Sequence, residues 1–154
     1  MREAERIVDQ LNRCFDGPAW HGDSVMEILQ GVTAQQAAAH PMAEAHSIWE
    51  IVRHMAAWQD VARRRIGGER FNPTAEENWS LITDTSDAAW QQMLAALRAS
   101  HTALKEAAAS LGGTELDNDD AGLEMAPYFL LHGVVQHNVY HAGQIALLKK
   151  FTVL

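Results

Sequence analysis

The stretch Leu130–Lys149, LLHGVVQHNVYHAGQIALLK, decides the fold and points to the chemistry of this chain. His137 and His141 stand four residues apart in a segment that otherwise has the composition of a buried helix. At about 100° per residue, positions i and i+4 lie on the same helical face, one turn apart. The other members of that face are apolar: Leu130, Val134, Ile145 and Leu148. The sequence therefore predicts two imidazoles on an apolar stripe, where water alone is a poor partner for them.

These two histidines need a partner, and a metal ion is the simplest candidate. A buried polar group without a partner costs about 1–3 kcal/mol. The alternative is a pair of core histidines bonded to backbone carbonyls or polar side chains, since HxxxH also arises by chance in a chain with eight histidines. Asn138 stands where HExxH metalloproteases carry their glutamate base. Two histidines do not complete a zinc site, so at least one more ligand must come from elsewhere.

Length and composition are those of an ordinary globular protein. The 154 residues, 47% apolar and 21% charged, can bury a sizeable core, and we expect one domain over residues 1–154. A net charge of −8 argues against nucleic acid or an anionic membrane surface as the main partner. The sequence predicts no membrane span, and its charged N-terminus lacks the apolar core of a signal peptide. A single cysteine, Cys14, fits a reducing cytoplasm.

Helical periodicity and helix-end signals predict an all-α chain with four long helices. These cover residues 3–15, 47–66, 86–111 and a last segment that begins at Pro127. Capping boxes at Ser24 and Thr33 predict short helices in the connection 16–45, which could form the wall of a pocket. Residues 69–85 and 114–125 are predicted to be loops, with Gly112-Gly113 ending the third helix. The predicted fold class is a four-helix bundle with short helices in its first long connection.

Two further histidines on predicted long helices are candidates for a third ligand. His54 lies on the flank of the apolar face of helix 47–66. A bundle that places this helix beside the last one can bring His54 to His137 and His141, although His54 could instead reach solvent. His101 shares the apolar stripe of helix 86–111 and is a fourth candidate, with a hydrogen-bonded core role as the alternative.

Several other residues receive a structural interpretation. His46 precedes the Ser47 cap and is predicted to be a loop residue, and Trp79 is expected to pack over the end of the bundle. Cys14 is most simply a small core residue rather than a catalytic thiol. The acidic run at 117–120 invites a calcium site, but the order of ligands and the closing glutamate of an EF-hand are absent. A solvated loop is the prediction there.

Three neutral imidazoles would suit zinc, nickel, copper or ferrous iron. Three protein ligands leave one position open for water, which is the arrangement of a catalytic zinc site rather than of a closed structural one. Such an ion can lower the pKa of bound water or hold a thiolate as the nucleophile. The spacing of the histidines does not by itself prove that the three residues meet.

Two segments of the chain, SIWEIVRHMAAWQ and LLHGVVQHNVYHAGQIALLKK, resemble the DinB-like (YfiT-type) metal-binding four-helix bundles, and HNVYHAGQI is the most specific match. WHGDSVMEILQGVTAQQAAAHP and NWS also resemble this family, so the resemblance covers nearly the whole chain. It implies an up-down-down-up bundle and a divalent metal, zinc or nickel above others, held by three histidines. Carried over to this sequence, the ligands are His54, His137 and His141.

Several members of the family that this chain resembles are S-transferases or isomerases that use bacillithiol, mycothiol or glutathione. The resemblance therefore implies a low-molecular-weight thiol, activated by the metal for attack on a small electrophilic substrate, with water as the alternative nucleophile. The iron-binding branch of sulfoxide synthases carries a glutamate two residues after the second histidine of HxxxH. Gly143 occupies that position here, which argues against an iron oxygenase.

Three residues near the expected ligands are candidates for contacts with the substrate or with the imidazoles. Trp58 lies one turn from His54, and Tyr140 and Gln144 each follow an expected ligand by three residues. They could orient imidazoles or line a pocket, with core or boundary packing as the alternative.

No general base stands out, so whether the chain is an enzyme stays open on sequence alone. A non-catalytic metal-binding structural or stress-response bundle is the second hypothesis, and a metal-free helical dimer is the third. In each case we expect a homodimer, because helix bundles with apolar side faces commonly pair.

Overall fold

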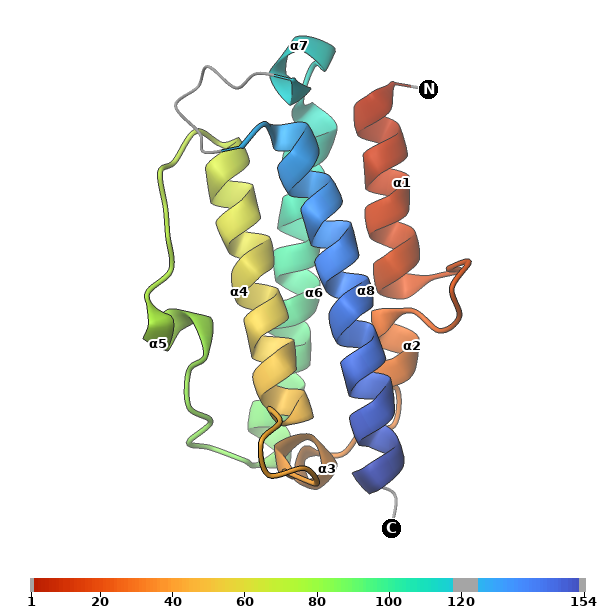
Figure 1. Cartoon of the computed structure of the whole chain (residues 1–154), viewed down its shortest axis with the longest axis vertical. Helices are drawn as coiled ribbons and strands as arrows, with labels where there is room; N and C mark the ends of the chain where they lie inside the picture. Colours follow the sequence, from red (N-terminus) through yellow and green to blue (C-terminus); the bar gives the residue numbers. More distant parts are fainter. Residues whose placement is uncertain (1, 118–124, 153–154) are drawn as a thin grey trace.

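The computed structural model describes residues 2–117 and 125–152 of the chain (Figure 1). The long elements of this part are four helices that form a bundle: α1 (Glu3–Asp16), α4 (Ile48–Ile66), α6 (Asp87–Ser110) and α8 (Pro127–Thr152). Short helices lie between them: α2 (Val25–Leu29), α3 (Ala34–Ala38), α5 (Ala75–Asn78) and α7 (Gly113–Leu116). The predicted all-α fold class is confirmed. None of the described helices is long and apolar enough to cross a membrane.

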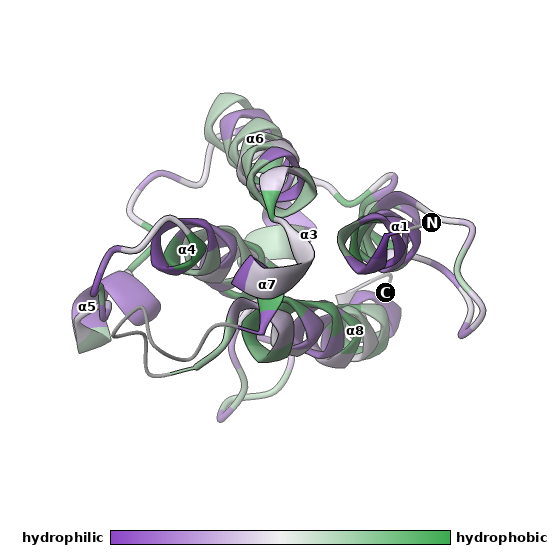
Figure 2. Cartoon of the chain, turned by 90° about the horizontal axis from the view of Figure 1, so that it is seen from above, coloured by the Kyte–Doolittle hydropathy of each residue, from purple (hydrophilic) through white to green (hydrophobic). Residues whose placement is uncertain are grey.

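The four long helices stand at the corners of a square when viewed from above (Figure 2). α4 packs against α6 and α8, and α1 packs against the same two helices on the other side. In Figure 1, α1 and α8 run from top to bottom, whereas α4 and α6 run from bottom to top. Because α4 and α6 are neighbours that run in the same direction, the connection between them must return along the length of the bundle. It does so on the outer side of α4 and carries α5 there (Figure 1).

Capping residues set where the helices begin, as the sequence predicts. Ser47 precedes α4, and its Oγ accepts a hydrogen bond of 3.2 Å from the backbone N–H of Glu50. The Glu50 carboxylate accepts one of 2.7 Å from the backbone N–H of Ser47, so both halves of the capping box are made. Thr33 caps α3 and Ser86 caps α6 in the same way through their hydroxyls.

Two short helices correct the prediction that residues 69–85 and 114–125 are loops. Thr74 and Glu77 form a capping box that starts α5, a signal that the sequence contains. Gly112 is the residue before α7 and does not terminate α6, which ends at Ser110 with Leu111 in an extended conformation. Neither glycine of the Gly112-Gly113 pair has a positive φ, so α6 does not end in a left-handed glycine.

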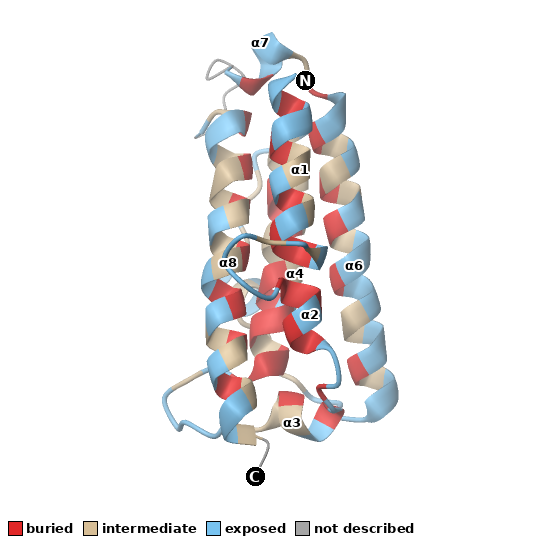
Figure 3. Ribbon diagram, turned by 90° about the vertical axis from the view of Figure 1, so that its right-hand side faces the viewer, coloured by how far each residue is buried: buried red, intermediate tan, exposed pale blue. Residues whose placement is uncertain are grey.

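The core runs the length of the bundle, but α1 does not (Figure 3). With 14 residues against 26 in α8, α1 is about 20 Å shorter. α2 and α3 cover the part of the bundle that α1 does not reach, and their buried faces join one hydrophobic cluster with α4 and α8. Two hydrogen bonds fasten this connection, from Trp90 Nε1 to the carbonyl of Val32 and from Lys149 Nζ to that of Ile28, each 2.8 Å. The end of the bundle nearest the C-terminus is thereby closed.

His101 is a buried imidazole with no hydrogen-bond partner among the described residues. Its side chain in α6 is 3% exposed and stacks on Phe15 of α1, with ring centroids 3.8 Å apart. Both ring nitrogens are buried and unpaired. Burial, followed by the nearby positive charge of Lys105, lowers the pKa of His101 from 6.5 to about 3. The folded protein therefore holds this ring neutral.

We expect His101→Leu to flatten the acid side of the stability profile. As pH falls below 6.5, the unfolded chain takes up a proton that the folded chain refuses down to pH 3, so the free energy of unfolding falls by about 1.4 kcal/mol per pH unit. A leucine of similar size removes that dependence. Urea unfolding at pH 7, 6 and 5 measures the slope, with exposed His21→Leu as the matched control. If the slopes of His101→Leu and of the unsubstituted protein coincide, His101 does not titrate as inferred.

Candidate metal centre

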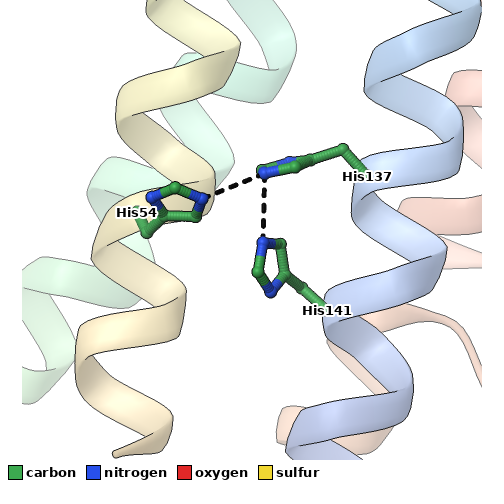
Figure 4. A group of neighbouring side chains, drawn as sticks. All are labelled: His54, His137 and His141. Carbon is green, nitrogen blue, oxygen red and sulfur yellow. Dashed lines mark hydrogen bonds between the residues drawn. The ribbon is translucent and has the colours of Figure 1, made fainter. Parts of the chain in front are cut away.

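Two helices, α4 and α8, bring three histidines to one point (Figure 4). His137 Nε2 lies 3.0 Å from His54 Nε2 and 3.0 Å from His141 Nε2. One ligand nitrogen from each ring lies within 4.8 Å of the other two, which is close enough for a single metal ion. In residues 2–117 and 125–152 this is the one group of three or more His, Cys, Asp or Glu side chains with such spacing.

Oxygen acceptors bind the Nδ1 atoms of His54 and His141 and so determine the tautomer of each ring. His54 Nδ1 lies 3.0 Å from the backbone carbonyl oxygen of Asn78. His141 Nδ1 lies 2.6 Å from Oε1 of Gln144, whose Nε2 donates to the hydroxyl of Tyr140 at 3.2 Å. Carbonyl and amide oxygens only accept hydrogen bonds, so Nδ1 carries the proton in both rings. The Nε2 atoms of His54 and His141 therefore direct lone pairs at His137.

Hydrogen bonds alone do not satisfy this arrangement, whereas a cation does. His137 Nε2 faces two lone pairs at 3.0 Å and can carry only one proton, so a direct hydrogen bond can be made to only one of them. The other contact sets two lone pairs against each other. A tetrahedral zinc ion with bonds of about 2.0–2.1 Å separates its ligand nitrogens by about 3.3 Å. The donor set therefore fits a divalent metal after small ring movements.

The surroundings of the cluster keep its imidazoles neutral. His54 and His141 are 7% and 4% exposed, and His137 is half-buried. Burial, and then the neighbouring His141 and His54, lowers the pKa of His137 from 6.5 to about 3. Burial also lowers the pKa of His54 and of His141. At pH 7 all three rings are in the neutral form that binds metal.

Trp79 forms one wall of the cluster, a position that the sequence did not predict. Its ring stacks on His54, with centroids 4.0 Å apart and planes 3° apart. His46 stacks on Trp79 with centroids 3.6 Å and planes 2° apart, so the indole is held between two imidazoles. The expectation that Trp79 packs over the end of the bundle is therefore wrong. It lies on the flank, because the connection between α4 and α6 passes along α4.

Asn78 links the cluster to Trp58. It is the last residue of α5, where carbonyl groups have no partner within the helix, and its free carbonyl holds His54. Its side-chain Oδ1 accepts a hydrogen bond of 2.7 Å from Trp58 Nε1. The Trp58 ring also lies with its centroid 6.2 Å from those of His54 and His137. Trp58 thus reaches the cluster both by ring contact and through Asn78.

The remaining candidates from the sequence divide between the cluster and the rest of the protein. Gln144 bonds His141, and the exposed Tyr140 bonds Gln144. His101 lies elsewhere, stacked on Phe15, and does not join the cluster. Cys14 is a core residue whose Sγ donates to a backbone carbonyl, and burial raises its pKa to about 11, so it carries no reactive thiolate. Most of the acidic run at 117–120 lies outside the described residues.

A groove of about 440 Å³ opens beside His141. One side is formed by the segment before α4, including His46, as the sequence suggested for this connection. Trp79, which stacks on His54, borders the groove on this side. The opposite side is formed by α8, through Tyr140, Gln144, Leu147 and Leu148. A small molecule in this groove would lie next to an imidazole of the cluster.

We expect Gln144→Ala to weaken metal binding by about 10- to 100-fold, the usual effect of removing a group that orients a ligand imidazole. The substitution removes the oxygen at 2.6 Å from His141 Nδ1, so the ring can rotate and change tautomer. Competition with a chromophoric chelator measures the affinity. Gln136→Ala, an exposed position on the same helix, is the matched control. Equal affinities for the two variants would contradict the role of Gln144.

Comparison with known proteins gives one match. A family model described as DinB superfamily matches residues 19–145 of the chain, which include all three histidines of the cluster. Searches of curated proteins and of solved structures gave no match.

Proposed function

Because this chain belongs to the DinB superfamily, we propose that its three-histidine cluster binds one divalent metal ion and serves an enzyme that adds a small thiol, or water, to a small electrophile. Zinc or nickel is the proposed metal. The proposed ligands are His54, His137 and His141. The proposal extends to the up-down-down-up order of the helices, with which the directions of the four long helices in Figure 1 agree.

The observation that carries the proposal is the convergence of three neutral imidazoles with one side left open. Two Nδ1 atoms are bonded to oxygen acceptors, so the Nε2 lone pairs point inward. Three nitrogen ligands leave room for a fourth group, and the groove beside His141 provides a place for a small electrophile next to the cluster. A bound ion would supply a Lewis acid that lowers the pKa of a thiol or of water.

The residues of the chain have separable roles in this proposal. Asn78 and Gln144 keep the imidazoles in the correct tautomer and orientation. Trp79 shields one side of His54 from water, and the groove positions the electrophile beside the nucleophile. In a transferase reaction the sulfur forms a bond to the electrophilic carbon, the leaving group departs with its electron pair, and the thiol proton passes to solvent.

The test is turnover of a model electrophile by zinc- and nickel-loaded protein. 1-Chloro-2,4-dinitrobenzene would be offered with bacillithiol, mycothiol, glutathione or no thiol, and thioether or phenol formation followed by absorbance. We expect metal-dependent product with at least one nucleophile and none above background with His137→Ala. Metal-loaded protein that turns over neither this nor a panel of epoxides and alkyl halides, yet melts higher than metal-free protein, would favour the non-catalytic structural or stress-response bundle.

We further propose that the protein forms a homodimer through the outer face of α8. Exposed large apolar side chains follow one stripe of this helix: Phe129, Tyr140, Leu147 and Phe151. Gly133 and Gly143 lie on the same stripe, and a Cβ at either would meet nothing within 4 Å. A glycine inside a helix lowers helix stability by about 1 kcal/mol relative to alanine. No contact within the described part of the chain requires a glycine at either position. A second α8 packed closely against the stripe would explain both features.

Size-exclusion chromatography with light scattering tests the dimer. We expect twice the mass of the chain at micromolar concentrations and the single mass for Leu147→Glu/Phe151→Glu. Leu81→Glu, which changes an exposed leucine away from α8, should stay dimeric. An unsubstituted protein that elutes with the mass of one chain would refute this part of the proposal.

A further inference from the structure

The groove beside His141 is apolar at its base and sides. Ile51 of α4 and Leu148 of α8 are buried residues that form its floor, each 3% exposed. Met42, Ala45 and Leu147 add apolar surface nearer the rim. Apolar contact of this kind stabilises a bound molecule in proportion to the apolar area removed from water, and it offers nothing to an ion.

The wall of the groove is held rigid before any ligand binds. Trp79 is clamped between His46 and His54, with both faces of its indole covered, so it presents an edge rather than a free face. Gln144 on the opposite side is bonded to both Tyr140 and His141. These groups supply neutral hydrogen-bond partners. A pocket that is already ordered loses little conformational entropy on binding.

Charge in the groove is negative. Among the described residues that line the groove, Glu44 is the one carboxylate. None of these lining residues is a lysine or an arginine. The nearest candidate cation on α8, Lys149, donates to the backbone carbonyls of Ile28 and Gln30 at 2.8 Å and is committed there. In the metal-free protein, a carboxylate, sulfonate or phosphate entering the groove would therefore lose its hydration without gaining an opposite charge.

From these three features we infer that the groove beside His141 binds an uncharged, apolar small molecule and rejects anions. This inference rests on the proposed function and refines it, since it assigns the groove to the electrophile and makes that electrophile neutral. A thiol that carries carboxylates must then approach the cluster from outside this groove. The volume of about 440 Å³ is enough for a substituted single aromatic ring.

The test compares two probes of similar shape, neutral 4-nitrobenzyl alcohol and anionic 4-nitrobenzenesulfonate. Calorimetric titration of the metal-free protein gives their dissociation constants. We expect the neutral probe to bind the metal-free protein at least about tenfold more tightly than the anion, because burying an unpaired charge is costly. Equal affinities, or tighter binding of the anion to metal-free protein, would overturn the inference.

Variants locate the binding and reduce the selectivity. Met42→Gln should weaken the neutral probe by about three- to tenfold by removing apolar contact, whereas Leu81→Gln, an exposed position outside the groove and away from α8, should leave it unchanged. Glu44→Lys should strengthen the anionic probe several-fold at low salt. If Met42→Gln and Glu44→Lys change neither constant, the groove is not the binding site. Because metal-free protein is titrated alone, this result does not depend on metal binding or turnover.

Discussion

Replacing His137 by alanine is expected to abolish stoichiometric metal binding. His137 stands between the other two imidazoles, and its Nε2 lies 3.0 Å from the Nε2 of each. Its loss removes the central ligand nitrogen and leaves only two. Removing a group that only orients a ligand costs about 10- to 100-fold in affinity, and removing a ligand itself should cost more. Metal content by mass spectrometry, on untagged protein loaded with zinc or nickel and then desalted, should fall from about one ion per chain to none.

Two controls make this result specific. His101→Ala alters a buried histidine that lies outside the cluster, so it should keep its metal even though it loses stability. His54→Ala and His141→Ala should behave as His137→Ala does, because each removes one of three nitrogens. If the chain binds no metal after loading, or if His137→Ala retains one ion per chain, the proposed ligand set is wrong.

Much of the bundle could be predicted because its signals are local. Ser47 and Glu50 sit three residues apart and cap α4 by themselves, and the apolar stripe of α1 identifies its inner face before any packing is known. The HxxxH spacing placed His137 and His141 on one face, and only the meeting with His54 required a contact between two helices. Helix spacing alone could name His54 as a candidate but could not choose it over His101; the resemblance to the DinB-like bundles made that choice.

The surroundings of the cluster could not be predicted because they depend on the path of a connection. Asn78 and Trp79 follow α4 in sequence by more than ten residues, and nothing local indicates that the chain turns back along α4. That path exists because α4 and α6 are neighbours with the same direction (Figure 1). Thr74 and Glu77 form a capping box that can be recognised in the sequence, so α5 could have been predicted. The stacking of Trp79 on His54 is a tertiary contact that no local pattern indicates.

The same geometry leads us to expect a large gain in stability on metal binding. In metal-free protein the cluster holds two lone pairs in opposition inside a buried site, and a bound ion would convert them into bonds between α4 and α8. By linkage, free metal at about 1,000 times its dissociation constant adds about 4 kcal/mol to the free energy of unfolding. For a domain of this length, that corresponds to a rise in Tm of about 8–16 °C.

Differential scanning calorimetry with and without zinc measures this rise, and His137→Ala supplies the control, because its Tm should not respond to the metal. The stabilisation should also persist below pH 6.5. Burial lowers the pKa of His137 to about 3, so in the folded state protons compete weakly for this nitrogen, while the histidines of the unfolded chain are already protonated and bind metal poorly. An identical Tm with and without zinc at pH 7 would mean that the three imidazoles do not act as a metal site.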